Sequence, residues 1–227
     1  MASSTNKRSD ASSPAKLIEA AVRLYGQHGI DGISLRQISK AAGSANNYAV
    51  QYHFGSAAGL IQAIMAKHVP QLERMREQML AEAEQQGSLA DTRTLVDILY
   101  RPLADYRDAD GERSYARFLL ALFHSRSGTD HPGPIEQLMA VSFQTLDLLY
   151  AANPEIPPGL MRERLRLITF LFLASIFNRY APFEGDAMDE ALIDNALAMA
   201  TSSLVAPVPT PLRQMAERAS EPGKRDS

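Results

Sequence analysis

Apolar residues recur at helical spacing along almost the whole chain, and no segment shows the alternation that is typical of a β-strand. The first pattern follows Ser13 and Pro14, which suit the N-cap and first turn of a helix, and Gly29 ends it. Turn compositions such as "DADG", "SGTDHPGP" and "NPEIPPG" separate the later patterns. The sequence therefore predicts an all-α protein, with helices over residues 14–28, 35–42, 46–53, 57–86, 91–106, 112–126, 134–151, 158–180 and 187–205.

The lengths of these helices divide the chain into four regions. Residues 1–13 are rich in serine and predict a flexible N-terminal arm. Residues 14–56 hold three short helices, whereas residues 57–206 hold the longer ones and predict a separate helical body. Three prolines within five residues open the last region, so residues 207–227 are expected to form a mobile tail.

Several classes of function find no support in the residues present. The chain has no cysteine, which excludes disulfide scaffolds, thiolate metal sites and cysteine nucleophiles. It lacks the phosphate-binding "GxxxxGK", the dinucleotide-binding "GxGxxG", the hydrolase "GxSxG" and the zinc-binding "HExxH" motifs. We therefore expect a protein that is not an enzyme and has no cofactor and no bound metal.

The distribution of apolar residues predicts a cytoplasmic protein with no membrane partner. The N-terminal residues have no apolar core and do not resemble a secretory signal. The longest nearly pure apolar run, Leu167 to Phe177, has eleven residues. A membrane-spanning helix needs roughly 20, so this run predicts a buried helix instead.

Charge is distributed unevenly between the two ends of the chain. Residues 1–55 carry six Lys or Arg and three Asp or Glu, whereas the remainder carries 17 basic and 23 acidic residues. A positive N-terminal region on a negative body is typical of a protein whose first region contacts a polyanion.

Amides, phenols and an imidazole gather within eight positions, from residue 46 to residue 53. The three short helices around them, with a glycine turn between the second and third, form a helix-turn-helix pattern. Such a unit places its last helix in the major groove of DNA. Amides can then bond base edges or phosphates, while phenols and imidazoles bond phosphate oxygens. Double-stranded DNA is therefore the predicted partner.

Two stretches, "KLIEAAVRLYGQHGIDGISLRQISKAAG" and "QYHFGSAAGLIQAI", resemble the TetR/AcrR family of bacterial transcriptional regulators. In that family a first helix ends in "GxxG", a second helix reads "S/T-xxxIAxxAG", and the recognition helix ends in "Y-H/Y-F". The resemblance extends over residues 14–67, and beyond them the chain is similar only in architecture. Ala57 stands where the family often has a lysine, which removes one phosphate contact. The matching residues are Gly29, Gly32, Ser34, Ile38, Ala42, Gly43, Tyr52, His53 and Phe54.

The resemblance implies a repressor that binds a palindromic operator as a homodimer and is released by a small, mostly apolar or aromatic effector. An activator of the same family and a helical interaction protein without DNA binding are the alternatives. By position, Ser34 and its helix N-terminus meet phosphate, and Arg36 points toward the groove, where it can pair with a guanine. The expected DNA-binding residues are Ser34, Arg36, Asn46, Asn47, Tyr48, Gln51, Tyr52 and His53.

The body offers candidates for the effector site. Many large aromatic residues lie between residues 91 and 180, and most could be ordinary core residues. The resemblance implies that some of them line a cavity with a few polar anchors. The expected ligand-binding residues are Tyr100, Phe118, His124, Phe143, Phe172 and Asn178.

The last two predicted helices, 158–180 and 187–205, predict the surface through which two chains associate. Their apolar faces are broader than one neighbour needs, and small residues in the second allow another helix to approach closely. These faces contain Leu165, Ile168, Leu171, Phe172 and Ile176, then Met188, Leu192, Ala196, Met199, Ala200 and Ser203.

Overall fold

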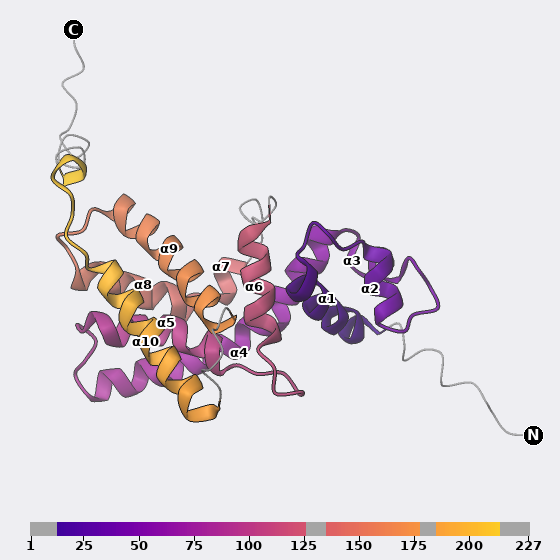
Figure 1. The fold of residues 1–227 in the computed structure, drawn as a ribbon, viewed down its shortest axis with the longest axis horizontal. Coiled ribbons are helices and arrows are strands. Elements are labelled where there is room, and N and C mark those ends of the chain that lie inside the picture. The colour runs from indigo at the N-terminus through magenta and orange to yellow at the C-terminus, as the bar shows by residue number, and fades with distance from the viewer. Residues whose placement is uncertain (1–12, 126–134, 178–184, 214–227) are drawn as a thin grey trace, which may run out of the picture.

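A computed structural model describes residues 13–125, 135–177 and 185–213, and the regular elements within them are all α-helices (Figure 1). The all-α prediction is confirmed. None of these helices is long and apolar enough to cross a membrane. The helices are α1 (Pro14–His28), α2 (Leu35–Ala41), α3 (Ala49–Phe54), α4 (Ala57–Gln85), α5 (Thr92–Asp105), α6 (Ser114–His124), α7 (Ile135–Leu138), α8 (Ala140–Ala152), α9 (Pro158–Phe177) and α10 (Asp186–Leu204).

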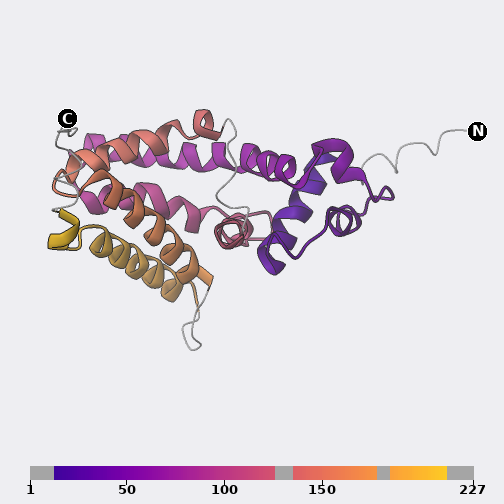
Figure 2. The same cartoon turned by 90° about the horizontal axis from the view of Figure 1, so that it is seen from above.

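The first three helices form a head at one end of the molecule, and α5 to α10 form a body at the other (Figures 1 and 2). The long helix α4 begins in the head and runs into the body, where it continues through Pro70. Within the body, α5 packs against α4 and α8 on one side and against α10 on the other, and α9 lies against α10. The head is also attached through α1, which packs along α6 with the rings of Tyr25 and Phe118 6.3 Å apart.

Local sequence explains where the first two helices begin. The Ser13 hydroxyl accepts a hydrogen bond from the Lys16 N–H, and Pro14 occupies the first turn of α1. Ser34 and Gln37 form a capping box at α2, because the Gln37 N–H donates to the Ser34 hydroxyl and the Gln37 Oε1 accepts from the Ser34 N–H. These boundaries agree with the prediction from sequence.

The third helix is shorter than predicted, because it begins at Ala49 and not at residue 46. The Oδ1 atom of Asn46 accepts a hydrogen bond from the Tyr48 N–H at 2.9 Å, which forms an Asx turn in place of a helical turn. The Asn46 N–H donates to the Ser44 hydroxyl. Asn46, Asn47 and Tyr48 therefore lie before α3 and not on it.

The helix predicted over residues 134–151 is interrupted at Met139, which separates α7 from α8. The cause lies in α4. One carboxylate oxygen of Glu73 accepts hydrogen bonds from the N–H groups of Val141 and Ser142, at 2.8 and 3.1 Å, and the other accepts from the Ser142 hydroxyl. A carboxylate at these amides is a strong N-cap, so α8 begins here.

The Glu73 carboxylate is also paired within the body. It is buried and lies 3.0 Å from the Arg76 guanidinium, which is buried too and donates to the Leu99 carbonyl oxygen. Burial lowers the pKa of Arg76, and the neighbouring Glu73 carboxylate opposes this shift. The pair thus joins α4 to α5 and α8 through fully hydrogen-bonded polar groups.

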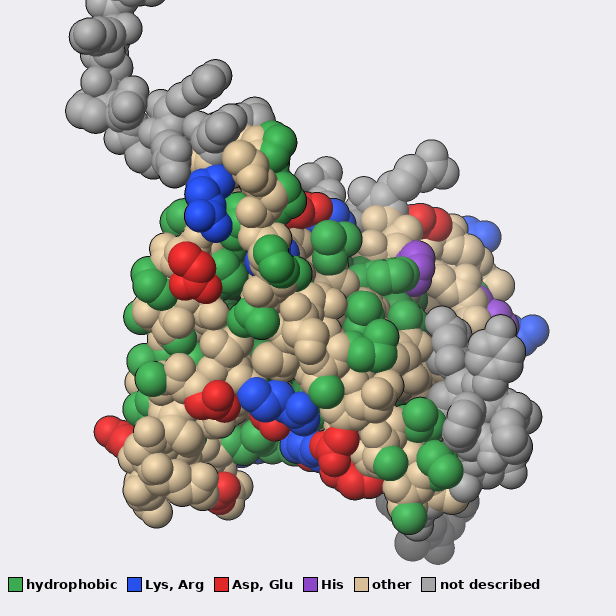
Figure 3. Space-filling view, turned by 60° about the vertical axis from the view of Figure 1, so that its left-hand side comes forward, with side chains coloured by type: hydrophobic (Ala, Val, Ile, Leu, Met, Phe, Trp, Pro, Cys, Tyr) green, Lys and Arg blue, Asp and Glu red, His purple; other side chains and the backbone are tan. Residues whose placement is uncertain are grey.

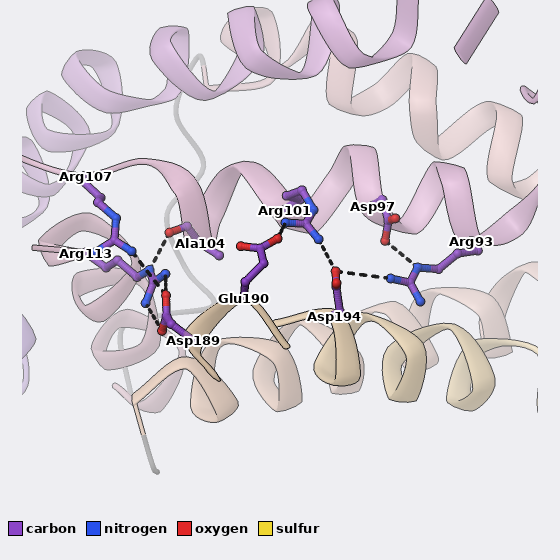
Figure 4. A network of polar contacts seen from close by, with 9 residues as sticks. All are labelled: Arg93, Asp97, Arg101, Ala104, Arg107, Arg113, Asp189, Glu190 and Asp194. Atoms are coloured by element: carbon purple, nitrogen blue, oxygen red, sulfur yellow. Dashed lines mark hydrogen bonds and ion pairs between the residues drawn. The ribbon is translucent and has the colours of Figure 1, made fainter. Parts of the chain in front are cut away.

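A network of arginines and carboxylates holds α10 against the body (Figure 4). Arg113 is buried and binds both carboxylate oxygens of Asp189, at 3.1 and 2.5 Å, while its Nε donates to the Ala104 carbonyl oxygen. Arg101 contacts Glu190, the residue after Asp189, and Asp194, which lies one turn of α10 beyond Glu190. Bidentate pairs of this kind fix orientation as well as contributing energy, so they determine how α10 lies on α5.

Candidate nucleic-acid interface

Two aromatic side chains, Tyr52 and Tyr48, are exposed on the surface of the head. Tyr52 is 81% exposed and Tyr48 is 55% exposed, although both are large and partly apolar. His53 is exposed as well, and its ring stands edge-on to the Tyr52 ring with the centroids 5.0 Å apart. Tyr52 is therefore a surface residue and not part of the core of the head.

The opposite face of α3 explains why these side chains point outward. Ala49 and Val50 are buried against the core of the head, and Phe54 is half-buried beside it. A helix of six residues has only one buried face, so Gln51, Tyr52 and His53 face solvent.

Arg36 on α2 contacts Tyr48. Its guanidinium donates a hydrogen bond of 2.7 Å to the Tyr48 hydroxyl, and its Cζ lies 5.1 Å from the centre of the ring. Both side chains are exposed, so the contact is present on the surface before any DNA is bound. It brings a guanidinium from α2 to the start of α3.

The remaining predicted DNA-binding residues are placed around this contact. Asn47 and Gln51 are exposed, and Asn46 is exposed with its Oδ1 engaged in the Asx turn. The Ser34 hydroxyl also belongs to the head surface, but it is engaged with the Gln37 side chain at 2.7 Å. The structure thus brings Arg36 and Tyr48 into contact and leaves Asn47, Gln51, Tyr52 and His53 open to solvent.

Sequence reasoning missed Ser39, which positions α3 against α2. Its buried hydroxyl donates to the Leu35 carbonyl oxygen at 3.1 Å and accepts from the Val50 N–H at 3.3 Å. The second bond satisfies an amide in the first turn of α3 that has no helical partner. The only sequence signal is a serine at a position that the helical spacing assigns to the buried side of α2.

The predicted effector residues that the structure describes are spread over α5, α6, α8 and α9 and differ in burial. Tyr100 and Phe172 are buried together with their rings 5.6 Å apart, and the Tyr100 hydroxyl lies 2.9 Å from the Thr169 hydroxyl. Burial raises the pKa of Tyr100 to about 12. Phe118 is buried in the contact between α1 and α6, and Phe143 is exposed on α8.

The two polar residues among the predicted effector residues are His124 and Asn178. His124 is exposed near the end of α6, where its Nδ1 lies 2.8 Å from the Leu120 carbonyl oxygen and its ring contacts Phe170. It lines a cavity of about 400 Å³ beside the C-terminal end of α1. Asn178 lies outside the described residues.

The apolar faces of α9 and α10 are largely covered by the chain itself. Ile168, Phe172, Ile176, Ala196 and Ala200 are all buried, so the reason given for expecting a partner there, a face too broad for one chain, does not hold for them. The apolar side chains that stay exposed are different ones. Figure 3 shows hydrophobic side chains scattered over the body surface, and on these two helices they are Leu167, Phe170, Met188 and Met199.

Comparison with known proteins finds a family match for the head. Residues 17–64 match the family model of the bacterial regulatory proteins of the tetR family, within the 14–67 region predicted from sequence. Among solved structures, the chain is similar to a proposed TetR-family transcriptional regulator from Mesorhizobium loti MAFF303099. That similarity has 14% identity and a TM-score of 0.40, and covers 87% of this chain and 98% of the other. No curated protein matches the chain.

Proposed function

We propose that this chain, whose residues 17–64 belong to the tetR family of bacterial regulatory proteins, represses transcription by binding a palindromic operator as a homodimer. Regulation of transcription follows from the family. The proposal adds to this that the chain is a repressor, that it contacts a palindromic operator, and that an effector releases it.

The observation that carries DNA binding is the exposed group formed by Arg36, Tyr48, Tyr52 and His53. Large aromatic side chains that are left exposed together are typical of an interaction surface. The phenols and the imidazole suit phosphate oxygens, and the guanidinium suits the O6 and N7 atoms of a guanine. Asn47 and Gln51 lie beside them as candidates for adenine or phosphate contacts.

The test begins with a duplex selected from a random library by the parent protein. Tyr52→Ala and His53→Ala should each weaken binding about tenfold on every sequence, because they remove contacts to the backbone. Tyr52→Ala should leave the dependence of affinity on salt concentration unchanged, because a neutral phenol releases no counterion when it contacts a phosphate. Gln78→Ala, at an exposed position of α4 in the body, is the control and should bind like the parent. Parent-like affinity of both head variants would disprove the interface.

Homodimerisation is proposed through the exposed parts of α9 and α10, where Phe170 is 40% exposed and Met199 48% exposed. The two recognition helices should then lie about 34–36 Å apart, or somewhat wider, to reach successive turns of the groove. Light scattering should find a dimer for the parent and a monomer for the double variant Phe170→Asp, Met199→Asp. A monomeric parent at micromolar concentration would refute the dimer.

Release by a small effector is proposed for the body, where Tyr100, Phe118, His124, Phe143, Phe172 and Asn178 remain the candidate residues. A ligand can change DNA affinity only through its different affinities for the two states of the protein. By linkage, operator DNA must weaken the effector by the same factor, and calorimetry with and without the duplex measures this. A reporter gene placed behind the selected operator distinguishes a repressor, which lowers expression, from an activator, which raises it.

A further inference from the structure

A cavity of about 310 Å³ lies where the head meets the body. Its walls come from α1 in the head, from the part of α4 near Lys67, and from residues 106–110, which connect α5 to α6, together with the start of α6. The volume is at the lower end of the range for sites that hold small molecules. Of the residues predicted from sequence to bind an effector, none of those that the structure describes lines it.

His68 lines this cavity and has one polar atom without a partner. The side chain is buried, its ring is stacked on Tyr115 at 4.7 Å, and its Nδ1 lies 2.9 Å from the Tyr106 hydroxyl. The Nε2 atom is buried and has no hydrogen-bond partner among the described residues. Buried polar atoms of this kind are rare, and each costs free energy until a partner satisfies it.

The ring of His68 is neutral at neutral pH. Burial, with a further contribution from the neighbouring charge of Lys67, lowers its pKa to about 4, against opposing effects of Glu19 and Asp108. The unpartnered Nε2 therefore calls for one ordinary hydrogen bond, as donor or acceptor according to the tautomer, and not for a counter-ion.

The charged groups around the cavity differ in whether they already have partners. Lys67 pairs with Glu19 at 3.2 Å, and the Asp108 carboxylate accepts from the N–H groups of Asp110 and Glu112. Arg23, on the exposed side of α1, makes no hydrogen bond within the part of the chain that the structure describes, and its positive charge contributes to lowering the pKa of Asp108 across the cavity. The N–H groups of its guanidinium can therefore still bind an anion, and carboxylates match their geometry bidentately.

We propose that this cavity binds a small aromatic carboxylate that carries a hydroxyl group. The carboxylate pairs with Arg23, the planar ring lies against the apolar surface of Val22 and the ring of Tyr106, and the hydroxyl bonds the Nε2 atom of His68. A hydroxyl group can donate or accept, so it satisfies either tautomer of the imidazole.

The place of the cavity connects this ligand to regulation, and this step rests on the proposed function. The ligand would touch α1 and α4, which carry the recognition helix, and the segment after α5 that belongs to the body. In that segment Arg107 also reaches Asp189 of α10, at 3.4 Å. Occupancy would therefore favour one orientation of the head relative to the body. If DNA binds the other orientation, it would lower the affinity for the ligand by the same factor by which the ligand lowers the affinity for DNA.

The test is calorimetry on the full chain without DNA, so its result does not depend on whether the operator contacts are correct. The probe is 4-hydroxybenzoate, and the comparison compounds are benzoate, which lacks the hydroxyl, and tyramine, which replaces the carboxylate by a cation. The parent should bind 4-hydroxybenzoate at submillimolar to millimolar concentration, bind benzoate several-fold more weakly, and bind tyramine more weakly than either.

Two variants and one control locate the binding. Arg23→Gln, at an exposed position where folding is not at stake, should weaken 4-hydroxybenzoate about tenfold or more, because it removes a charge-assisted pair. His68→Phe keeps an aromatic ring at this position but removes the Nε2 atom. It should lower the affinity for 4-hydroxybenzoate to that for benzoate. Arg162→Gln, at an exposed position of α9, should bind like the parent. No heat from 4-hydroxybenzoate with the parent, equal affinities of the parent and Arg23→Gln, or preference for tyramine would each overturn the proposal.

Discussion

The guanidinium of Arg36 and the phenol of Tyr48 meet on the head surface, 2.7 Å apart at their polar atoms, although twelve residues separate them in the chain. The guanidinium carbon also lies 5.1 Å from the ring centre, a distance at which a cation is attracted to an aromatic face. The contact holds a flexible arginine in one position before DNA arrives. Pre-positioning of this kind reduces the entropy lost on binding.

The first prediction separates the two functions of this pair. Arg36→Ala should weaken a selected operator by about 1–3 kcal/mol and relax the preference at one base pair, because it removes a base contact. Tyr48→Phe removes only the hydroxyl and should cost about 0.5–1.5 kcal/mol. Fluorescence anisotropy on the selected duplex and on single-base variants measures both effects. Arg74→Ala, exposed on α4, is the matched arginine control, and an unchanged base preference in Arg36→Ala would show that this guanidinium reads no base.

The second prediction concerns the buried hydroxyl of Ser39. Ser39→Ala leaves the Val50 N–H without its partner, so the free energy of unfolding should fall by about 1 kcal/mol. Urea denaturation followed by circular dichroism gives this value, with Gln78→Ala as a control at an exposed site. Because Val50 lies in the first turn of α3, operator affinity should fall as well. Stability equal to that of the parent would mean that water replaces the hydroxyl without cost.

The third prediction concerns the ion pair between α4 and the body. Glu73→Ala leaves the buried Arg76 guanidinium without its counter-charge and uncaps α8, so the free energy of unfolding should fall by about 3–5 kcal/mol. Glu77→Ala removes an exposed carboxylate one turn further along the same helix and should change stability little. Glu73→Gln keeps an acceptor for the α8 amides and should fall between the two. Equal unfolding midpoints for Glu73→Ala and Glu77→Ala would contradict the assigned role.

The fourth prediction follows from the pKa of His68, which burial lowers to about 4 from the ordinary value of 6.5. Between these values the unfolded chain binds a proton that the folded chain excludes, so stability falls as the pH is lowered from about 6.5 toward 4. From pH 6 to pH 5 this one group should contribute a loss of about 1 kcal/mol. Above pH 7 it should contribute no pH dependence.

A comparison with His68→Phe isolates this contribution, because the other titrating groups are common to both proteins. The free energy of unfolding of each protein is measured in urea at pH 7, 6 and 5. The parent should lose stability relative to the variant as the pH falls. A constant difference between the two would show that the imidazole has an ordinary pKa in the fold.

Local residue patterns were sufficient to predict the first two helices of the head and the character of its surface. Ser13, Pro14 and the pair of Ser34 with Gln37 act on amides within the same turn, so their effect is readable in the chain itself. The same holds for Tyr52 and His53, because a short helix with one apolar face must expose the other. The match of residues 17–64 to the tetR family model lies within the region predicted from sequence for the same reason, since the pattern of the family is contained in consecutive residues.

What only the tertiary structure decided depends on contacts between distant residues. The interruption at Met139 arises from Glu73, more than sixty residues earlier in the chain. The burial of Phe172 and Ile176 depends on which helices cover α9. Helical spacing alone does not show whether an apolar face is covered by another helix of the same chain or by a second chain. The cavity at His68 exists because α1, α4 and the residues after α5 converge, and an unpartnered nitrogen is defined only by everything that surrounds it. Spacing along a chain records which face of a helix is apolar, whereas the identity of what lies against that face is set by packing.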